Sequence, residues 1–177
     1  MYGAVLGDII GSPYEGGGAV AKDFPLFDEE PKFTDDTVMT VAVAEALLKF
    51  KGGLGQDSPM PEEAQELYLS GNRKDRKVIK AVTKSLRKWG LQYEWADYGA
   101  GFNLWLHTKN AEPYYSYGNG SAMRCSAAGW LGHTIEEAER LAGLSACVTH
   151  NHPEGIKGAQ ATAAAIYYTS QEVPMIP

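Results

Sequence analysis

The distribution of apolar residues along the chain predicts helices, and no stretch shows the alternation typical of a strand. Five stretches have the composition or the spacing of helices: 2–10, 38–50, 61–69, 75–89 and 155–169. A further helix is predicted after Thr134-x-x-Glu137, which has the form of a capping box and precedes an apolar stripe. These features predict an all-α fold.

Two of the predicted helices are expected to be buried. Residues 38–50 are apolar nearly all round, which predicts a central helix. Residues 2–10 are apolar and rich in small side chains, and this helix should end at Gly11-Ser12-Pro13, since proline cannot continue the hydrogen-bond ladder. Glycines at 52 and 53 and the His152-Pro153 pair are expected to end other helices.

Length and composition indicate one globular domain over residues 1–177, at roughly 150 residues per domain. A hydrophobic content of 44% excludes wholesale disorder, and a net charge of −6 argues against nucleic-acid binding. No apolar run is long enough to cross a membrane, and no basic leader begins the chain. Cys125 and Cys147 lie in apolar stretches and are expected to be buried thiols. We therefore expect a cytoplasmic protein.

An acidic motif, Thr34-Asp35-Asp36-Thr37, precedes the predicted central helix. Two carboxylates flanked by hydroxyls supply the hard oxygen ligands that suit Mg²⁺ or Mn²⁺. An ordinary helix start is the alternative, because Thr is a good N-cap and Asp is favoured in a first turn. Glu15 follows Pro13 on a glycine-flanked turn, where a carboxylate can act as a general base or bind a metal-bound water. Asp8 is expected to be a buried acid that orients neighbouring backbone.

A glycine-rich segment, Tyr117-Gly118-Asn119-Gly120-Ser121-Ala122-Met123-Arg124, is the second candidate site. Glycines let the backbone approach a ligand, and successive N–H groups that enter a helix can bind a pyrophosphate. The alternative is a plain turn before a buried helix over 122–131. The segment is neither a P-loop nor a dinucleotide fingerprint, because no Gly-Lys-Ser/Thr follows it and no strand precedes it.

Two histidines, His150 and His152, stand at the end of a predicted helix. Zinc is disfavoured, since no cysteine or further histidine with ligand spacing accompanies them. A neutral hydrogen-bonding role at a ligand and a purely structural role are both open at this point.

In order and spacing, these segments resemble the ADP-ribosylglycohydrolase family. The resemblance extends from residue 2 to about residue 168 and rests on four motifs in series: Gly3-Ala-Val-Leu-Gly7-Asp8 with Gly11 and Glu15, Thr34-Asp35-Asp36-Thr37, the segment 117–124, and Leu144-Ser145 through Thr149-His150. It implies an orthogonal multi-helix bundle with magnesium ions in a cleft. It also implies hydrolysis at the anomeric carbon of the terminal ribose of an ADP-ribose conjugate, such as a modified protein side chain or O-acyl-ADP-ribose.

The resemblance also implies roles for individual residues. The metal ligands would be Thr34, Asp35 and Asp36, with Glu15 as the acid/base residue and Asp36 also in the catalytic centre. The remaining implied residues contact the substrate: Tyr117, Gly118, Asn119, Gly120, Ser121, His150 and, on a looser match, Asp97.

One departure from the family pattern concerns the metal site. The family carries a second acidic motif, Asp-x-Asp-Thr, near its C-terminus, and no Asp-x-Asp occurs in this sequence. Three explanations are open: a truncated member with little activity, a second chain that completes the site, or local substitution by Glu154 or another acid. Because an uncovered, almost uncharged helix over 155–169 would expose a large apolar patch, we expect a homodimer or a swapped assembly.

These observations and the family resemblance leave three alternative functions. The first is a magnesium-dependent ADP-ribosyl hydrolase. The second is a non-catalytic ADP-ribose or nucleotide binder, and the third is a structural protein that shares only the fold.

Overall fold

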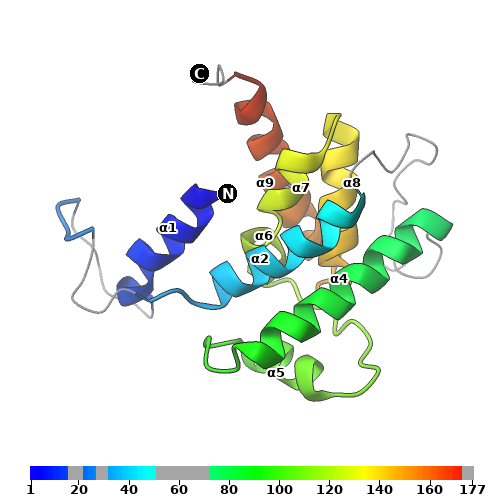
Figure 1. The fold of residues 1–177 in the computed structure, drawn as a ribbon, viewed down its shortest axis with the longest axis horizontal. Coiled ribbons are helices and arrows are strands. Elements are labelled where there is room, and N and C mark those ends of the chain that lie inside the picture. The colour runs from blue at the N-terminus through cyan, green and yellow to red at the C-terminus, as the bar shows by residue number, and fades with distance from the viewer. Residues whose placement is uncertain (16–21, 27–31, 51–71, 173–177) are drawn as a thin grey trace.

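A computed structural model describes residues 1–15, 22–26, 32–50 and 72–172, and no strand occurs among them. The fold is built from α-helices joined by short turns and loops (Figure 1). In chain order they are α1 (Tyr2–Gly11), α2 (Asp35–Leu47), α4 (Arg73–Gln92), α5 (Ala100–His107), α6 (Gly120–Met123), α7 (Ser126–Leu131), α8 (Ile135–Ala146) and α9 (Pro153–Glu172). The all-α prediction is confirmed for these residues. The helix predicted over 61–69 and the glycines at 52 and 53 lie outside them.

Helix α2 is the centre of the fold, as its nearly uniform apolar surface predicts. It packs mainly against α4 and also contacts α7, α1 and α6 (Figure 1). Its core-forming side chains are almost completely inaccessible to solvent: Val38, Met39, Ala42, Val43, Ala46 and Leu47. A 3₁₀ turn, Leu48–Phe50, follows it.

Helices α6 to α9 form the second part of the core. Helix α8 begins as predicted, since the Thr134 side chain accepts a hydrogen bond from the Glu137 amide at 3.2 Å. The Glu137 carboxylate accepts from the His133 amide at 2.9 Å, one residue earlier than in a standard capping box. Helix α9 packs on α6, α7 and α8. A Cβ on Gly129 in α7 would come within 2.7 Å of the Ala163 carbonyl oxygen, so glycine is needed for this close approach.

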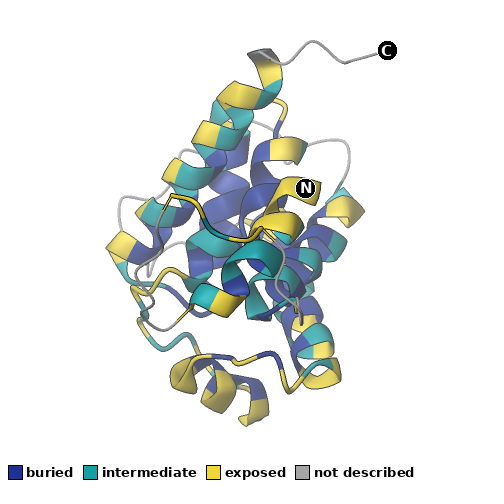
Figure 2. Ribbon diagram, turned by 90° about the vertical axis from the view of Figure 1, so that its left-hand side faces the viewer, coloured by how far each residue is buried: buried dark blue, intermediate teal, exposed yellow. Residues whose placement is uncertain are grey.

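Helix α1 corrects one prediction, because it is largely exposed rather than buried. The side chains of Tyr2 and Leu6 are 88% and 48% exposed, and Asp8 is the one buried residue of this helix. Figure 2 shows the helix that begins at the N-terminus largely in the colour of exposed residues. The physical reason is that α1 packs on α2 and on the 3₁₀ turn Ser12–Tyr14, and no other described helix covers its outer face.

A second difference concerns residues 122–131, where the chain forms two short helices instead of one. The α-helix is interrupted at Arg124 and Cys125, between α6 and α7, although the backbone of both residues stays in the right-handed helical region. Both cysteines are free and buried, as expected, and burial raises the pKa of each thiol to about 12. None of the described helices combines the length and the apolar character that crossing a membrane requires.

Helix α9 is covered on one side by its neighbours. Ile156, Ala159 and Ala163 are buried, while Tyr168 on another face is exposed. The helix is therefore less bare than the sequence alone indicates. The homo-oligomer expected from an uncovered α9 stays a prediction.

Candidate active site

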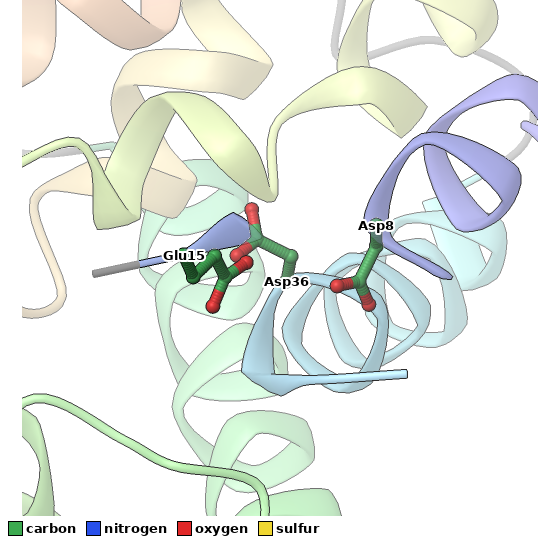
Figure 3. A group of neighbouring side chains, drawn as sticks. All are labelled: Asp8, Glu15 and Asp36. Carbon is green, nitrogen blue, oxygen red and sulfur yellow. The ribbon is translucent and has the colours of Figure 1, made fainter. Parts of the chain in front are cut away.

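Three carboxylates from separate segments converge at the beginning of α2. Asp8 comes from α1, Glu15 follows the 3₁₀ turn, and Asp36 lies in the first turn of α2. One ligand atom from each lies within 4.8 Å of the others. Figure 3 shows Asp36 between the other two side chains. We call these three residues the carboxylate triplet.

Asp8 holds the first turn of α2 through a network of hydrogen bonds. Its Oδ2 atom accepts from the amides of Thr34 and Thr37 at 2.8 and 3.1 Å. Its Oδ1 atom accepts from the Thr34 hydroxyl at 2.7 Å. The expected role of Asp8, a buried acid that orients nearby backbone, is confirmed. Its membership of the triplet is an addition that the spacing of the sequence did not indicate.

We expect Asp8→Ala and Asp8→Asn to separate the hydrogen bonds that Asp8 accepts from backbone amides from the charge that it adds to the triplet. The alanine variant leaves buried donors without an acceptor, so its free energy of unfolding should fall by about 1.5–3 kcal/mol. The asparagine variant keeps an oxygen for the two backbone amides, removes the charge and replaces the acceptor of the Thr34 hydroxyl by an NH2 donor, so it should lose less than the alanine variant. Urea unfolding in EDTA measures both. Equal losses in the two variants would show that the two amide bonds contribute little to the stability of α2.

The motif Thr34–Thr37 starts a helix, as one of its two interpretations predicts. Thr34 is the N-cap, and its hydroxyl accepts from the Asp36 amide at 3.3 Å while donating to Asp8. Asp35 is not one of the three carboxylates of the triplet. Roles of Thr34 and Asp35 as metal ligands stay predictions.

Mutual repulsion and burial set the electrostatics of the site. Burial, then Asp36 and Glu15, raise the pKa of Asp35 to about 7. Burial, followed by the nearby charge of Asp8, raises the pKa of Asp36. The pKa of Glu15 is also raised, by burial and then by Asp36 and Asp8, and Lys32 opposes this. The region thus carries an excess of negative charge that a cation would offset.

Helix α2 also connects the triplet to the glycine-rich segment. Thr40 follows Asp36 by four residues, so both lie on one face of the helix. The Thr40 hydroxyl donates to the Met123 carbonyl at 3.1 Å, which joins that face to α6. Helix α6 begins at Gly120, and no side chain caps its N-terminus. The acidic and glycine-rich motifs therefore lie on adjoining elements.

The glycine-rich segment rests on His150 and on the beginning of α9. A Cβ on Gly120 would lie 3.0 Å from His150 Nε2, and a Cβ on Gly155 would lie 2.8 Å from the Ser116 carbonyl oxygen. A side chain at position 155 would therefore clash with backbone, and one at position 120 would require His150 to shift. The buried Ser121 hydroxyl donates to the Gly155 carbonyl at 2.7 Å. The Ser121 hydroxyl is thus occupied by a hydrogen bond within the fold. The ligand contact predicted for Ser121 would therefore involve its backbone.

The two histidines have different surroundings. His150 is 5% exposed, and burial together with the charge of Arg124 lowers its pKa to about 3, so its imidazole is neutral at pH 7. His152 lies nearer the surface between two aromatic rings, with centroids 4.7 Å from Tyr115 and 5.2 Å from Tyr117. Neither histidine belongs to a group of metal-ligating side chains within the described residues.

Two predicted substrate contacts, Tyr117 and Asp97, lie on the surface. Tyr117 is the first residue of the glycine-rich segment, and its side chain is 74% exposed. Asp97 adopts a positive φ of 58° and pairs with Lys32 at 3.4 Å, and its charge contributes to the raised pKa of Glu15. This electrostatic effect places Asp97 in the field of the triplet. Its contact with substrate stays a prediction.

Glu154, one candidate for the missing acid, is not part of the triplet. It is exposed and pairs with Lys157 at 3.1 Å.

Tyr98 is a residue near the site that the sequence analysis does not identify as a candidate. Its hydroxyl is buried without a hydrogen-bond partner among the described residues, and burial and the charge of Asp35 raise its pKa. The one feature of the sequence that could have indicated Tyr98 is its position next to Asp97.

This combination of an all-α fold, a carboxylate triplet and an adjoining glycine-rich segment agrees with the result of a family comparison. A model of the ADP-ribosylglycohydrolase family matches residues 1–174, and the chain therefore belongs to that family.

The chain is similar to several proteins named ADP-ribosylhydrolase ARH3. It is 28% identical to the protein from Mus musculus over 189 residues, which cover 98% of this chain and 48% of that protein. The protein from Xenopus tropicalis is 29% identical over 184 residues, and the one from Homo sapiens 27% over 187, each with 97% of this chain and 49% of the relative covered. The chain thus spans about half the length of the relatives it matches.

Proposed function

We propose that this chain carries out magnesium-dependent hydrolysis of the glycosidic bond at the terminal ribose of ADP-ribose conjugates, either modified protein side chains or O-acyl-ADP-ribose. The observation that carries this proposal is the convergence of Asp8, Glu15 and Asp36 on one end of α2, the helix whose adjoining face meets the glycine-rich segment. Family membership and the similarity to proteins named ADP-ribosylhydrolase support it.

The donor set of the triplet fits a hard divalent cation. All three groups are carboxylates, and burial followed by repulsion from neighbouring carboxylates raises the pKa of both Asp36 and Glu15, a cost that a bound cation would reduce. We propose that Asp8 and Asp36 hold the ion together with Thr34 and Asp35. When bound, Mg²⁺ would polarise a water and orient ribose hydroxyls.

The residues of the chain divide the remaining work between two regions. In the reaction, water adds to the anomeric carbon, the bond from that carbon to the leaving group breaks, and a proton passes to the leaving group. Glu15 is the proposed carrier of this proton, at its carboxylate oxygens. The backbone of Gly118, Asn119, Gly120 and Ser121 is proposed to hold the diphosphate, with Tyr117 and His150 beside the nucleotide or ribose.

The test is calorimetry and product analysis on the same preparation. We expect ADP-ribose to bind the chain in Mg²⁺ and O-acyl-ADP-ribose to release ADP-ribose, with both activities lost in EDTA. The variant Asp36→Asn should lose the Mg²⁺-dependent binding and release. Binding that resists EDTA, with no product, would overturn hydrolysis and favour a non-catalytic nucleotide binder. Absence of both binding and release would overturn the proposal entirely.

A further inference from the structure

A buried chain of hydrogen bonds leads from a guanidinium to the imidazole beside the glycine-rich segment. Arg124 Nη2 donates to the Ser145 carbonyl at 3.0 Å and to Thr149 Oγ1 at 2.8 Å. Thr149 Oγ1 lies 2.8 Å from His150 Nδ1. Arg124, Thr149 and His150 are 1%, 0% and 5% exposed, so water competes little with these bonds.

The chemistry of the three groups fixes the direction of each bond. A guanidinium has donors and no acceptor, so the Thr149 oxygen must accept from Arg124. The Thr149 hydroxyl proton then needs an acceptor, and His150 Nδ1 is the one that the described residues place within hydrogen-bond distance. The opposite assignment, with a proton on Nδ1, would leave the buried hydroxyl without an acceptor. Because an unmade buried hydrogen bond is costly, Nδ1 should carry no proton.

The opposite edge of the imidazole faces the glycine-rich segment. A Cβ placed on Gly120 would lie 3.0 Å from Nε2, and one placed on Gly118 would lie 3.9 Å from it. Among the described residues Nε2 has no hydrogen-bond partner, although the imidazole as a whole is buried. A neutral imidazole with Nδ1 as acceptor must carry its proton on Nε2. The ring therefore presents one N–H donor to the segment.

We propose that Arg124 and Thr149 are positioning residues that fix His150 as the neutral Nε2–H tautomer, so that it donates one hydrogen bond to an oxygen of a ligand held at the glycine-rich segment. The identity of this ligand as the diphosphate or ribose of ADP-ribose rests on the proposed function. The tautomer does not, because it is a property of the free protein.

The first test is ¹⁵N NMR of the full chain labelled at histidine, without ligand. The chain contains 4 histidines, so a His150→Asn variant assigns the ring of interest. We expect the wild-type ring to be neutral with its proton on Nε2. Thr149→Val removes the hydroxyl and should allow a measurable Nδ1–H population, whereas Thr149→Ser keeps the hydroxyl and should preserve the wild-type spectrum. A wild-type proton on Nδ1 overturns the proposal, even if the valine variant fails to fold.

The second test measures ADP-ribose affinity by calorimetry in Mg²⁺. Loss of one oriented hydrogen bond should raise the Kd of Thr149→Val about tenfold, and Thr149→Ser should stay close to the wild type. Unchanged affinity in Thr149→Val would overturn the role of the chain of hydrogen bonds in binding. If the wild type does not bind ADP-ribose at all, the proposed function fails, while the NMR spectrum still decides the tautomer.

Discussion

Glu15→Gln should lower the rate of Mg²⁺-dependent ADP-ribose release by about 10²–10⁴-fold, the usual contribution of a positioned general acid or base. Glutamine keeps the size and polarity of the side chain and cannot carry a proton between water and leaving group. The affinity for ADP-ribose, which has no leaving group, should change little. Steady-state kinetics and calorimetry on the same protein measure the two effects.

The matched control is Glu154→Gln, which makes the same chemical change at an exposed residue paired with Lys157. It should leave the rate unchanged. A Mg²⁺ titration of Glu15→Gln distinguishes proton transfer from metal binding, because extra Mg²⁺ restores a rate lost through weak binding alone. Near-normal turnover in Glu15→Gln would exclude Glu15 as the acid/base residue and would mean that another carboxylate has this role.

Local patterns predicted much of this fold, because their causes lie within a few residues. Thr134 and Glu137 supply their own helix start, and the uniformly apolar α2 requires neighbours on all sides. The motif Thr34–Thr37 likewise contains its own N-cap. In each case the physical driving force is contained in adjacent residues, so the sequence alone was sufficient.

Long-range contacts decided what the sequence could not show. In the sequence, Asp8 is a lone acid in an apolar helix. Its position close to Glu15 and Asp36 depends on how α1 packs against α2. The exposure of α1 has the same origin, since apolar composition does not reveal which neighbours are present. The contact of Arg124 with Thr149 joins residues 25 positions apart. Only the fold brings such groups together.

A buried ion pair joins helix α4 to helix α8. Asp75 at the beginning of α4 and Arg140 in α8 are 1% and 7% exposed, and Arg140 Nε donates to Asp75 Oδ1 at 3.1 Å. A second bond joins Arg140 Nη2 to Oδ2 of the same carboxylate. The pair connects the helix that supports α2 with the helix that leads to Thr149 and His150.

Arg140→Met should lower the free energy of unfolding by about 3–5 kcal/mol, because it leaves the Asp75 carboxylate buried without its counter-charge. The double variant Asp75→Leu/Arg140→Met removes both charges and should recover most of this loss, since apolar pairs often replace buried ion pairs at little cost. Arg73→Met, at an exposed position of α4, is the matched control and should change stability by less than about 0.5 kcal/mol. Urea unfolding followed by circular dichroism gives all three values. A loss under about 1 kcal/mol in Arg140→Met would mean that the Asp75 carboxylate reaches water in the variant, and that packing alone holds α4 against α8.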